Sequence, residues 1–222
     1  MKRYAVIVAG GTGSRMNAEV PKQFMLLNGI PVIFYSIQKF AAAQAEIVVV
    51  MNTQYAADWK KLCEIHKLNI PHIMVNGGSI RSQSVLNGLQ SIVDNNSIVA
   101  VHDAARPVLT LKLIEQCFAA AQQYGCAIPV VDINESIRNI TPSVNIAVNR
   151  DEFKIVQTPQ CFNTMFLKNA FAKWEGQQFT DEASMFESAG NKIHTIEGEP
   201  NNIKITRPAD LLIASQILLQ HD

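Results

Sequence analysis

The feature that most constrains this chain is the alternation of short apolar runs with stretches of helical periodicity. Five runs are rich in Val, Ile and Ala, and they cover residues 4–9, 47–51, 72–75, 98–102 and 127–131. These runs are continuously apolar, which is typical of parallel strands that are covered on both faces. Strands that alternate with helices wind into an open sheet through right-handed crossovers. The pattern therefore predicts an α/β protein.

Helical patterns fill the spaces between these runs. Pro31 stands in the first turn of one helix, and Gly125 follows the end of another. We expect helices from Pro31 onward and over residues 83–93, 111–124, 163–174, 181–189 and 208–219. Further strands are expected near residues 155–157, 193–196 and 202–205. With no repeat or linker, residues 1–222 read as one Rossmann-like domain whose mostly parallel sheet carries helices on both faces.

Residues 133–150 break this rhythm. Val144, Ile146 and Val148 alternate with polar residues, and a Thr-Pro-Ser turn precedes them. A two-stranded hairpin is only marginally stable in water, so its apolar residues need a surface to lie on. We interpret the segment as a protruding β-arm that packs on a partner subunit. An extra hairpin on the chain's own sheet is the alternative.

The overall charge limits the possible partners. Nineteen basic residues balance nineteen acidic ones, so no net field attracts nucleic acid or a membrane surface. No apolar stretch approaches the roughly 18 residues of a membrane helix. The four cysteines show no metal-ligand spacing with the histidines, which favours a reduced, cytoplasmic setting. Any anion must be bound by charge placed locally, and residues 1–22 hold four basic side chains and one acid.

The loop after the first run has the composition of a phosphate-binding turn. It reads Ala9-Gly10-Gly11-Thr12-Gly13-Ser14-Arg15-Met16, with Lys22 a little further on. Glycines let the backbone approach a ligand, and cationic side chains complement a polyphosphate. Met16 replaces the third glycine of a dinucleotide fingerprint, and the loop lacks the Gly-Lys-Ser/Thr of a P-loop. An ordinary turn between a strand and a helix is an equal alternative for this loop alone.

Two further loops follow predicted strands, where open α/β sheets bind their ligands. Residues 76–84 contain Gly77-Gly78 followed by Arg81 at a helix start, which suits an anion or a base. Asp103 and Arg106 follow the fourth run. Asp103 can hold Mg²⁺, often through water, or it can pair with Arg106 and fix the turn. We favour a functional Asp103, because three such loops converge on one edge of the sheet.

The motifs together resemble a known family. They are GGTGSRM at residues 10–16, PKQF at 21–24, VHDAARPV at 101–108, TPQ at 158–160, TDEA at 180–183 and NIKITRP at 202–208. In this order they are similar to the 2-C-methyl-D-erythritol 4-phosphate cytidylyltransferases of the non-mevalonate isoprenoid pathway, from residue 4 to about residue 215. The resemblance implies that a phosphate oxygen of the sugar-alcohol phosphate attacks the α-phosphorus of CTP, and that Mg²⁺-pyrophosphate leaves.

The resemblance also implies roles for individual residues. The catalytic set would be Arg15, Lys22, Arg150 and Lys204. CTP would be bound by Ala9, Gly10, Gly11, Thr12, Gly13, Gly78, Ser84, Asp103 and Ala104. The second substrate would be bound by Asp103, Arg106, Ser136, Arg150, Thr158, Thr180 and Lys204. Asp103 would also position Mg²⁺, the expected cofactor.

In such enzymes the arm exchanges across a homodimer, so Arg150 would serve the partner's site. Two positions depart from the family: Ser79 stands where some relatives carry an acid, and Ser136 replaces a usual threonine. A ribitol-5-phosphate cytidylyltransferase would share the nucleotide half, but the TDEA and NIKITRP motifs favour the methylerythritol enzyme. A non-catalytic nucleotide-binding module would bind CTP without turnover, and the presence of both Lys22 and Asp103 argues against it.

Overall fold

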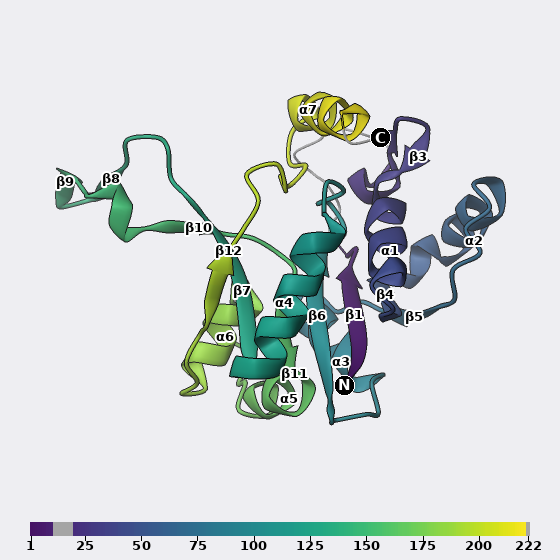
Figure 1. Cartoon of the computed structure of the whole chain (residues 1–222), viewed down its shortest axis with the longest axis horizontal. Coiled ribbons are helices and arrows are strands. Elements are labelled where there is room, and N and C mark those ends of the chain that lie inside the picture. Colours follow the sequence, from purple (N-terminus) through teal and green to yellow (C-terminus); the bar gives the residue numbers. More distant parts are fainter. Residues whose placement is uncertain (11–19, 221–222) are drawn as a thin grey trace.

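A computed structural model describes residues 1–10 and 20–220 of the chain. Its centre is a mostly parallel sheet with the strand order β10-β7-β11-β6-β1-β4-β5 (Figure 1). β12 also pairs with β7, outside this order. Four strands pair with one another in parallel, namely β1 (Lys2–Val8), β4 (Glu46–Met51), β5 (His72–Asn76) and β6 (Ser97–Asp103), and the pairing of β12 with β7 is parallel as well. The remaining strands are β7 (Cys126–Asp132), β10 (Lys154–Val156), β11 (Gln160–Asn163) and β12 (Thr195–Glu197). The predicted Rossmann-like α/β fold is confirmed.

Strand β11 is the main addition to the predicted sheet. It lies antiparallel between β6 and β7, with Gln160 opposite Val101 and Cys161 opposite Ala127. Its four residues carry no periodic pattern that marks them as a strand. The TPQ motif therefore lies beside the carboxyl end of β6, where Asp103 also lies.

Helices cover both faces of the sheet, and side chains of β1 alternate between the two cores. Ala5 and Ile7 pack on α1 (Val32–Ala42), α2 (Ala56–Ile65) and α4 (Leu111–Tyr124). Tyr4 and Val6 pack on α3 (Arg81–Gln90), α5 (Thr164–Ala172) and α6 (Glu182–Ser188). Helix α7 (Pro208–Leu219) joins a third, smaller core with Leu27 of the strand β2 (Leu26–Leu27), and β2 pairs with β3 (Ile30–Pro31). Short 3₁₀ turns are also present at Lys22–Phe24, Thr53–Tyr55 and Arg150–Glu152.

Gly88 sets the position of α3 over the sheet. A Cβ atom at this position would come within 2.7 Å of Val6 Cγ1 and 2.9 Å of Val50 Cγ2. Glycine therefore lets the helix lie close to β1 and β4. This close packing fixes the first residue of the helix, Arg81, at the carboxyl edge of the sheet.

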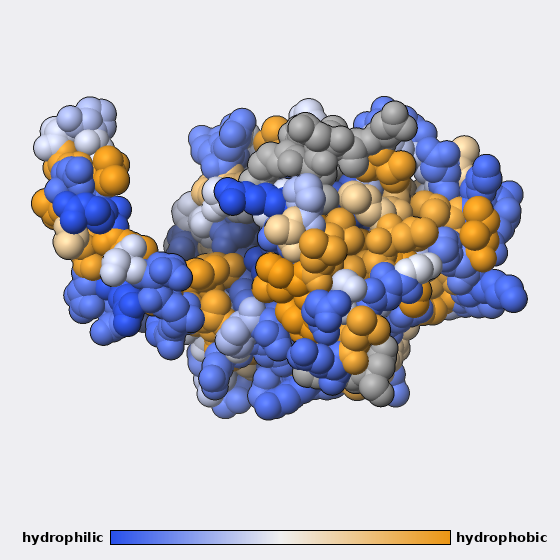
Figure 2. All heavy atoms as spheres, turned by 90° about the horizontal axis from the view of Figure 1, so that it is seen from above, coloured by the Kyte–Doolittle hydropathy of each residue, from blue (hydrophilic) through white to orange (hydrophobic). Residues whose placement is uncertain are grey.

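The break in the predicted pattern is an arm. β8 (Arg138–Thr141) and β9 (Val144–Ala147) pair only with each other in the described part of the chain, and they extend away from the body (Figure 1). Ile140 and Ile146 are 68% and 55% exposed. Apolar side chains are accordingly visible along the arm in Figure 2. The structure therefore has a protruding arm and not an extra hairpin on the central sheet.

Several details differ from prediction. Residues 202–205 form no strand; instead the Ile205 N–H donates to the carbonyl of Ala105. β5 forms an edge of the sheet, and its Ile73 and Met74 are exposed, because no strand of the described residues pairs with its outer side. Pro31 precedes α1 as its N-cap residue rather than standing inside the first turn. None of the helices described here has the length and apolar character that a membrane crossing requires.

Candidate active site

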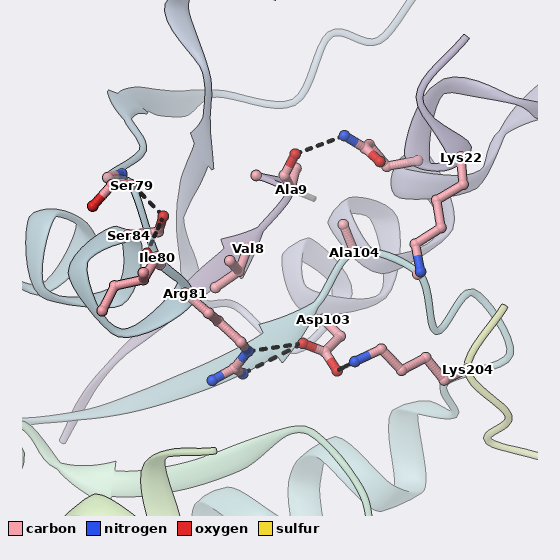
Figure 3. Close-up of a pocket in the computed structure, with 14 residues that line it drawn as sticks. Val8, Ala9, Lys22, Ser79, Ile80, Arg81, Ser84, Asp103, Ala104 and Lys204 are labelled. Carbon is pink, nitrogen blue, oxygen red and sulfur yellow. Dashed lines mark hydrogen bonds and ion pairs between the residues drawn. The ribbon is translucent and has the colours of Figure 1, made fainter. Parts of the chain in front are cut away.

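A cavity of about 410 Å³ opens at the carboxyl ends of β1 and β6, beside the start of α3 (Figure 3). This volume falls in the range of small-molecule sites. Its lining is formed by Val8, Ala9, Gly10, Lys22, Gln23, Gly78, Ser79, Ile80, Arg81, Ser84, Asp103, Ala104, Ala105 and Lys204. The three strand-end loops that were predicted to converge therefore do meet.

The wall formed by the 76–84 loop is held by its own hydrogen bonds. The Gly78 N–H donates to Ser84 Oγ at 3.0 Å, and Ser84 Oγ donates to the carbonyl of Ile80 at 3.1 Å. A Cβ atom on residue 78 would lie only 2.2 Å from Gln83 Cγ, so the loop needs glycine there. Ser84 thus shapes the loop, and the backbone around Gly78 faces the cavity.

The opposite wall carries Lys22 and Gln23. The amide of Gln23 is buried and donates to the carbonyl of Ala9 at 2.7 Å, which fixes the end of β1. Lys22 Nζ donates to the carbonyl of Ile205 at 2.8 Å. A lysine held at its tip in this way presents a positive charge to the cavity with little freedom to move away.

Asp103 forms the floor of the cavity and is surrounded by three cations. Its Oδ2 lies 2.7 Å from Lys204 Nζ and 4.0 Å from Arg106 Nε, and its Oδ1 lies 3.3 Å from Arg81 NH2 (Figure 3). Burial acts to raise the pKa of Asp103, but the charges of Arg81 and Lys204 outweigh it and hold that pKa well below the usual range. Asp103 therefore stays ionised, and the floor keeps a net positive charge suited to anions.

A directional chain of hydrogen bonds supports this floor from below. His102 Nε2 lies 3.3 Å from the carbonyl of Arg106, which can only accept, so we assign the imidazole proton to Nε2. Nδ1 then accepts from the Thr158 hydroxyl, whose oxygen accepts from the Asp103 N–H at 3.1 Å. Burial lowers the pKa of His102 to about 4, so the ring is neutral. His102 is therefore a structural hydrogen-bonding residue beneath the floor.

Two charged residues of this region escaped the sequence-based assignment. Arg81 lines the cavity, and Glu182, which is 1% exposed, lies 2.5 Å from Arg81 NH1. The one signal for Arg81 was its place at a helix start after two glycines. Nothing in the sequence distinguishes Glu182 from a solvated helical acid, since its partner lies 101 residues away.

The predicted site residues fall into four groups. Those that line the cavity are Ala9, Gly10, Lys22, Gly78, Ser84, Asp103, Ala104 and Lys204. Arg106 and Thr158 lie buried beneath it. Thr180, Ser136 and Arg150 are exposed and do not line it. Gly11, Thr12, Gly13 and Arg15 lie outside the described residues.

Arg150 is placed at the base of the arm. Its NH1 donates to the carbonyl of Asn134 at 2.5 Å, and its side chain is 49% exposed. Ser136 is exposed on the same segment. The structure therefore separates the arm residues from the cavity of their own chain.

The donor set suits a magnesium ion that arrives with a nucleotide. Across residues 1–10 and 20–220, no three His, Cys, Asp or Glu side chains gather as an all-protein metal site would need. Nucleotide-bound Mg²⁺ commonly takes one or two carboxylates and completes its shell with phosphates and water. Asp103 is the carboxylate among the described lining residues, and its oxygens face the cavity. The site fits such an ion on this basis.

The cavity lies between the carboxyl ends of β1 and β6, where a Rossmann-like sheet reverses its strand order, and this is the place where such sheets bind nucleotides. The family model for 2-C-methyl-D-erythritol 4-phosphate cytidylyltransferase matches residues 4–220. The enzyme of that name from Bacteroides thetaiotaomicron is 41% identical over 220 residues, which cover 98% of this chain and 100% of the relative. The Thermus thermophilus structure of that name has a TM-score of 0.78 at 27% identity and covers 98% of both chains. The chain belongs to the 2-C-methyl-D-erythritol 4-phosphate cytidylyltransferase family.

Another similar protein is named as a bifunctional enzyme. A bifunctional IspD/IspF enzyme from Desulfotalea psychrophila is 37% identical over 222 residues, which cover 98% of this chain and 57% of the relative. The similarity is therefore confined to about half of that longer protein.

Proposed function

We infer that this chain transfers the cytidylyl group of CTP to 2-C-methyl-D-erythritol 4-phosphate. A phosphate oxygen of the sugar-alcohol phosphate forms a bond to the α-phosphorus of CTP. The bond from that phosphorus to the β-phosphate oxygen breaks, and pyrophosphate leaves with the electron pair. The products are 4-diphosphocytidyl-2-C-methyl-D-erythritol and pyrophosphate. The observation that carries this conclusion is family membership over residues 4–220, with Lys22, Asp103 and Lys204 of the family's motifs lining one cationic cavity.

The chain's own residues would act mainly by charge and position, which is what phosphoryl-type transfers need. We place the cytosine against the backbone around Gly78, and the triphosphate along residues 9–13 at the end of β1. Lys22 faces the same cavity, where its charge would offset the charge that builds on the α-phosphate. Arg15 would add to this effect from the same loop.

The second substrate would approach from the side of Lys204. That lysine lies 2.7 Å from Asp103 Oδ2, and Arg106 Nε lies 4.0 Å from the same oxygen. These cations can bind a phosphate dianion, and Thr180 would contribute a hydroxyl. Bound Mg²⁺ would neutralise charge on the triphosphate and on the departing pyrophosphate. Asp103 would hold that ion, directly or through water.

A homodimer that exchanges its arms would complete the site. The apolar residues Ile140 and Ile146 are exposed on the arm, and Arg150 lies at its base, away from the cavity of its own chain. An arm laid on a partner would cover these apolar residues and bring Arg150 and Ser136 to the partner's second-substrate side. We place the reaction in the cytoplasm, an assignment supported by the cysteine spacing.

The direct test is pyrophosphate release by the purified protein with CTP, Mg²⁺ and 2-C-methyl-D-erythritol 4-phosphate. Ribitol 5-phosphate is run beside it at equal concentration. We expect turnover that depends on the methylerythritol phosphate. Faster release with ribitol 5-phosphate would reassign the second substrate, and CTP binding without release would leave a binding module.

A further inference from the structure

Arg81 and Glu182 form a buried ion pair between the two halves of the molecule. Arg81 begins α3, next to the loop that we assign to the base, whereas Glu182 begins α6 in the TDEA motif. NH1 of Arg81 donates to Glu182 Oε1 at 2.5 Å, and its Nε and NH2 face Asp103 Oδ1 at 3.4 and 3.3 Å. One guanidinium therefore connects a buried carboxylate with the carboxylate on the cavity floor.

Glu182 is itself held rigidly. The N–H groups of Glu182 and Ala183 both donate to Gln160 Oε1, at 3.1 and 3.0 Å. Gln160 Nε2 donates in turn to Asp181 Oδ2 at 2.9 Å, and Asp181 caps the helix through Ser184. Because Gln160 belongs to β11, this clamp ties the start of α6 to the central sheet.

Stability alone gives little reason for such a pair. Taking two charges out of water costs several kcal/mol each, and apolar residues of similar size commonly do as well. Burial raises the pKa of Glu182, and the charge of Arg81 opposes that rise. Glu182 Oε2 also has no hydrogen-bond partner among the described residues. The position of the Arg81–Glu182 pair at the cavity suggests instead that the pair orients the groups around it.

We propose that Arg81 belongs to the reaction site by holding Asp103, and that Glu182 is a positioning residue that acts on the reaction through Arg81. Asp103 alone could not fix this arginine, because Lys204 shares the same carboxylate and bound anions would compete for the guanidinium. Glu182 binds NH1 of Arg81 at a buried position that neither Lys204 nor a bound anion contests. The Nε and NH2 edge then stays turned toward Asp103 when substrates enter. This inference rests on the proposed function.

The test is a double-mutant cycle with Glu182→Gln, Arg81→Gln and the double variant. Glu182→Gln keeps the size of the side chain and an acceptor oxygen but removes the charge. We expect kcat to fall about tenfold while KM for CTP changes less than threefold, since Arg81 acts on Asp103. In the Arg81→Gln background the second substitution should lower kcat no further. Glu187→Gln, on the exposed side of the same helix, should keep the activity of the unmodified protein.

Thermal unfolding of the same proteins supplies a readout that needs no substrate. Arg81→Gln strands a buried carboxylate and should lower Tm most, and adding Glu182→Gln should recover part of that loss without restoring kcat. Equal kcat losses from Glu182→Gln in both backgrounds, or no loss in either, would overturn the proposal. A purely structural pair would restore activity together with Tm. Absence of pyrophosphate release by the unmodified protein would refute the proposed function and leave the pair's coupling measurable.

Discussion

The cavity floor and the β8–β9 arm both carry charged residues of the proposed site, but they hold them by opposite means. Asp103 is 9% exposed and contacts cations from three different segments of its own chain. Arg150 is exposed at the base of a hairpin whose strands pair only with each other among the described residues. The comparison teaches that one chain fixes the floor through its own contacts, whereas the arm makes few contacts with the described body of its own chain, which is why we propose a partner subunit as its surface.

The largest effect should come from the cavity side. Lys22→Ala removes a cation that faces the α-phosphate position, and its charge matters most in the transition state. We expect kcat to fall by roughly 10²–10³-fold, the usual result of removing one such stabilising group, with a much smaller change in CTP affinity. Steady-state kinetics together with calorimetric CTP binding measure both. Equal losses in the two quantities would assign Lys22 to ground-state binding.

Acid stability should also separate the two regions. The pKa of His102 is lowered from 6.5 to about 4 by burial, so the unfolded chain binds the proton first as the pH falls. The contribution of His102 to the free energy of unfolding should therefore fall by about 3 kcal/mol between pH 6.5 and pH 4. Above pH 6.5 this contribution is fully present. Denaturant titrations of the native protein and of His102→Gln measure this slope.

The difference between those two curves isolates His102. Glu182, whose pKa burial raises, contributes a slope of the opposite sign in both proteins. An arm variant such as Ile140→Ser serves as the matched control and should keep the native slope, since no titrating group is changed. Parallel curves for the native protein and His102→Gln would show that the imidazole does not control acid stability.

Arg150→Ala tests whether the arm serves a site. The loss of a charged hydrogen bond to the second substrate should cost roughly 1.5–3 kcal/mol, or about 10–150-fold in kcat/KM for the sugar-alcohol phosphate. Melting should change little, because the side chain is 49% exposed. Initial rates at varied sugar-alcohol phosphate measure the effect, and Lys154→Ala on β10 is a nearby basic control.

Mixed dimers sharpen the same point. Subunits with Arg150→Ala and subunits with Lys22→Ala are combined, and each alone is nearly inactive. If arms cross between chains, one site of each heterodimer regains both residues and part of the activity returns. Verified heterodimers without recovered activity would place Arg150 outside any shared site.

The smallest effect should come from the apolar side of the arm. Ile140→Ser and Ile146→Ser change residues that are 68% and 55% exposed, so unfolding of the isolated chain should shift by less than about 0.5 kcal/mol. Each substitution should raise the dimer dissociation constant by about tenfold, which corresponds to the lower end of the roughly 1.5–3 kcal/mol that burying such a side chain contributes. Sedimentation velocity over a dilution series measures it. An unchanged dissociation constant would exclude the arm from the interface.

Sequence patterns recovered the parts of this molecule that depend on local rules. β1, β4, β6 and β7 were predictable because strands covered on both faces are continuously apolar, and α4 was recovered because Gly125 ends it in a left-handed conformation. β11 was not, since its burial arises from the two strands beside it. The 202–205 segment was wrongly predicted as a strand, because its apolar residues serve α7 and Lys204 serves Asp103.

The site followed the same division. Gly78, Lys22 and Asp103 were found because strand-end loops in a parallel sheet share one edge. The Arg81–Glu182 pair could not be predicted from the sequence, because the two residues are 101 positions apart and meet only in the folded chain. Thr158 was expected to touch substrate, whereas its buried hydroxyl bonds to His102 and to the Asp103 N–H. The residues that line the cavity could be predicted from the sequence, but the buried residues that hold them in place could not.

The distribution of the cavity along the chain has a consequence for biosynthesis. Arg81 and Asp103 belong to the first half of the chain, but Glu182 and Lys204, which neutralise them, are translated near its end. A ribosome-bound chain that stops before residue 182 would present these charges without their partners. Because domains generally fold as units, α3 and β6 cannot form this wall of the cavity until the C-terminal residues have emerged. The last 40 or so residues therefore complete the cavity, and a chain truncated there should lack an assembled site rather than keep a weakened one.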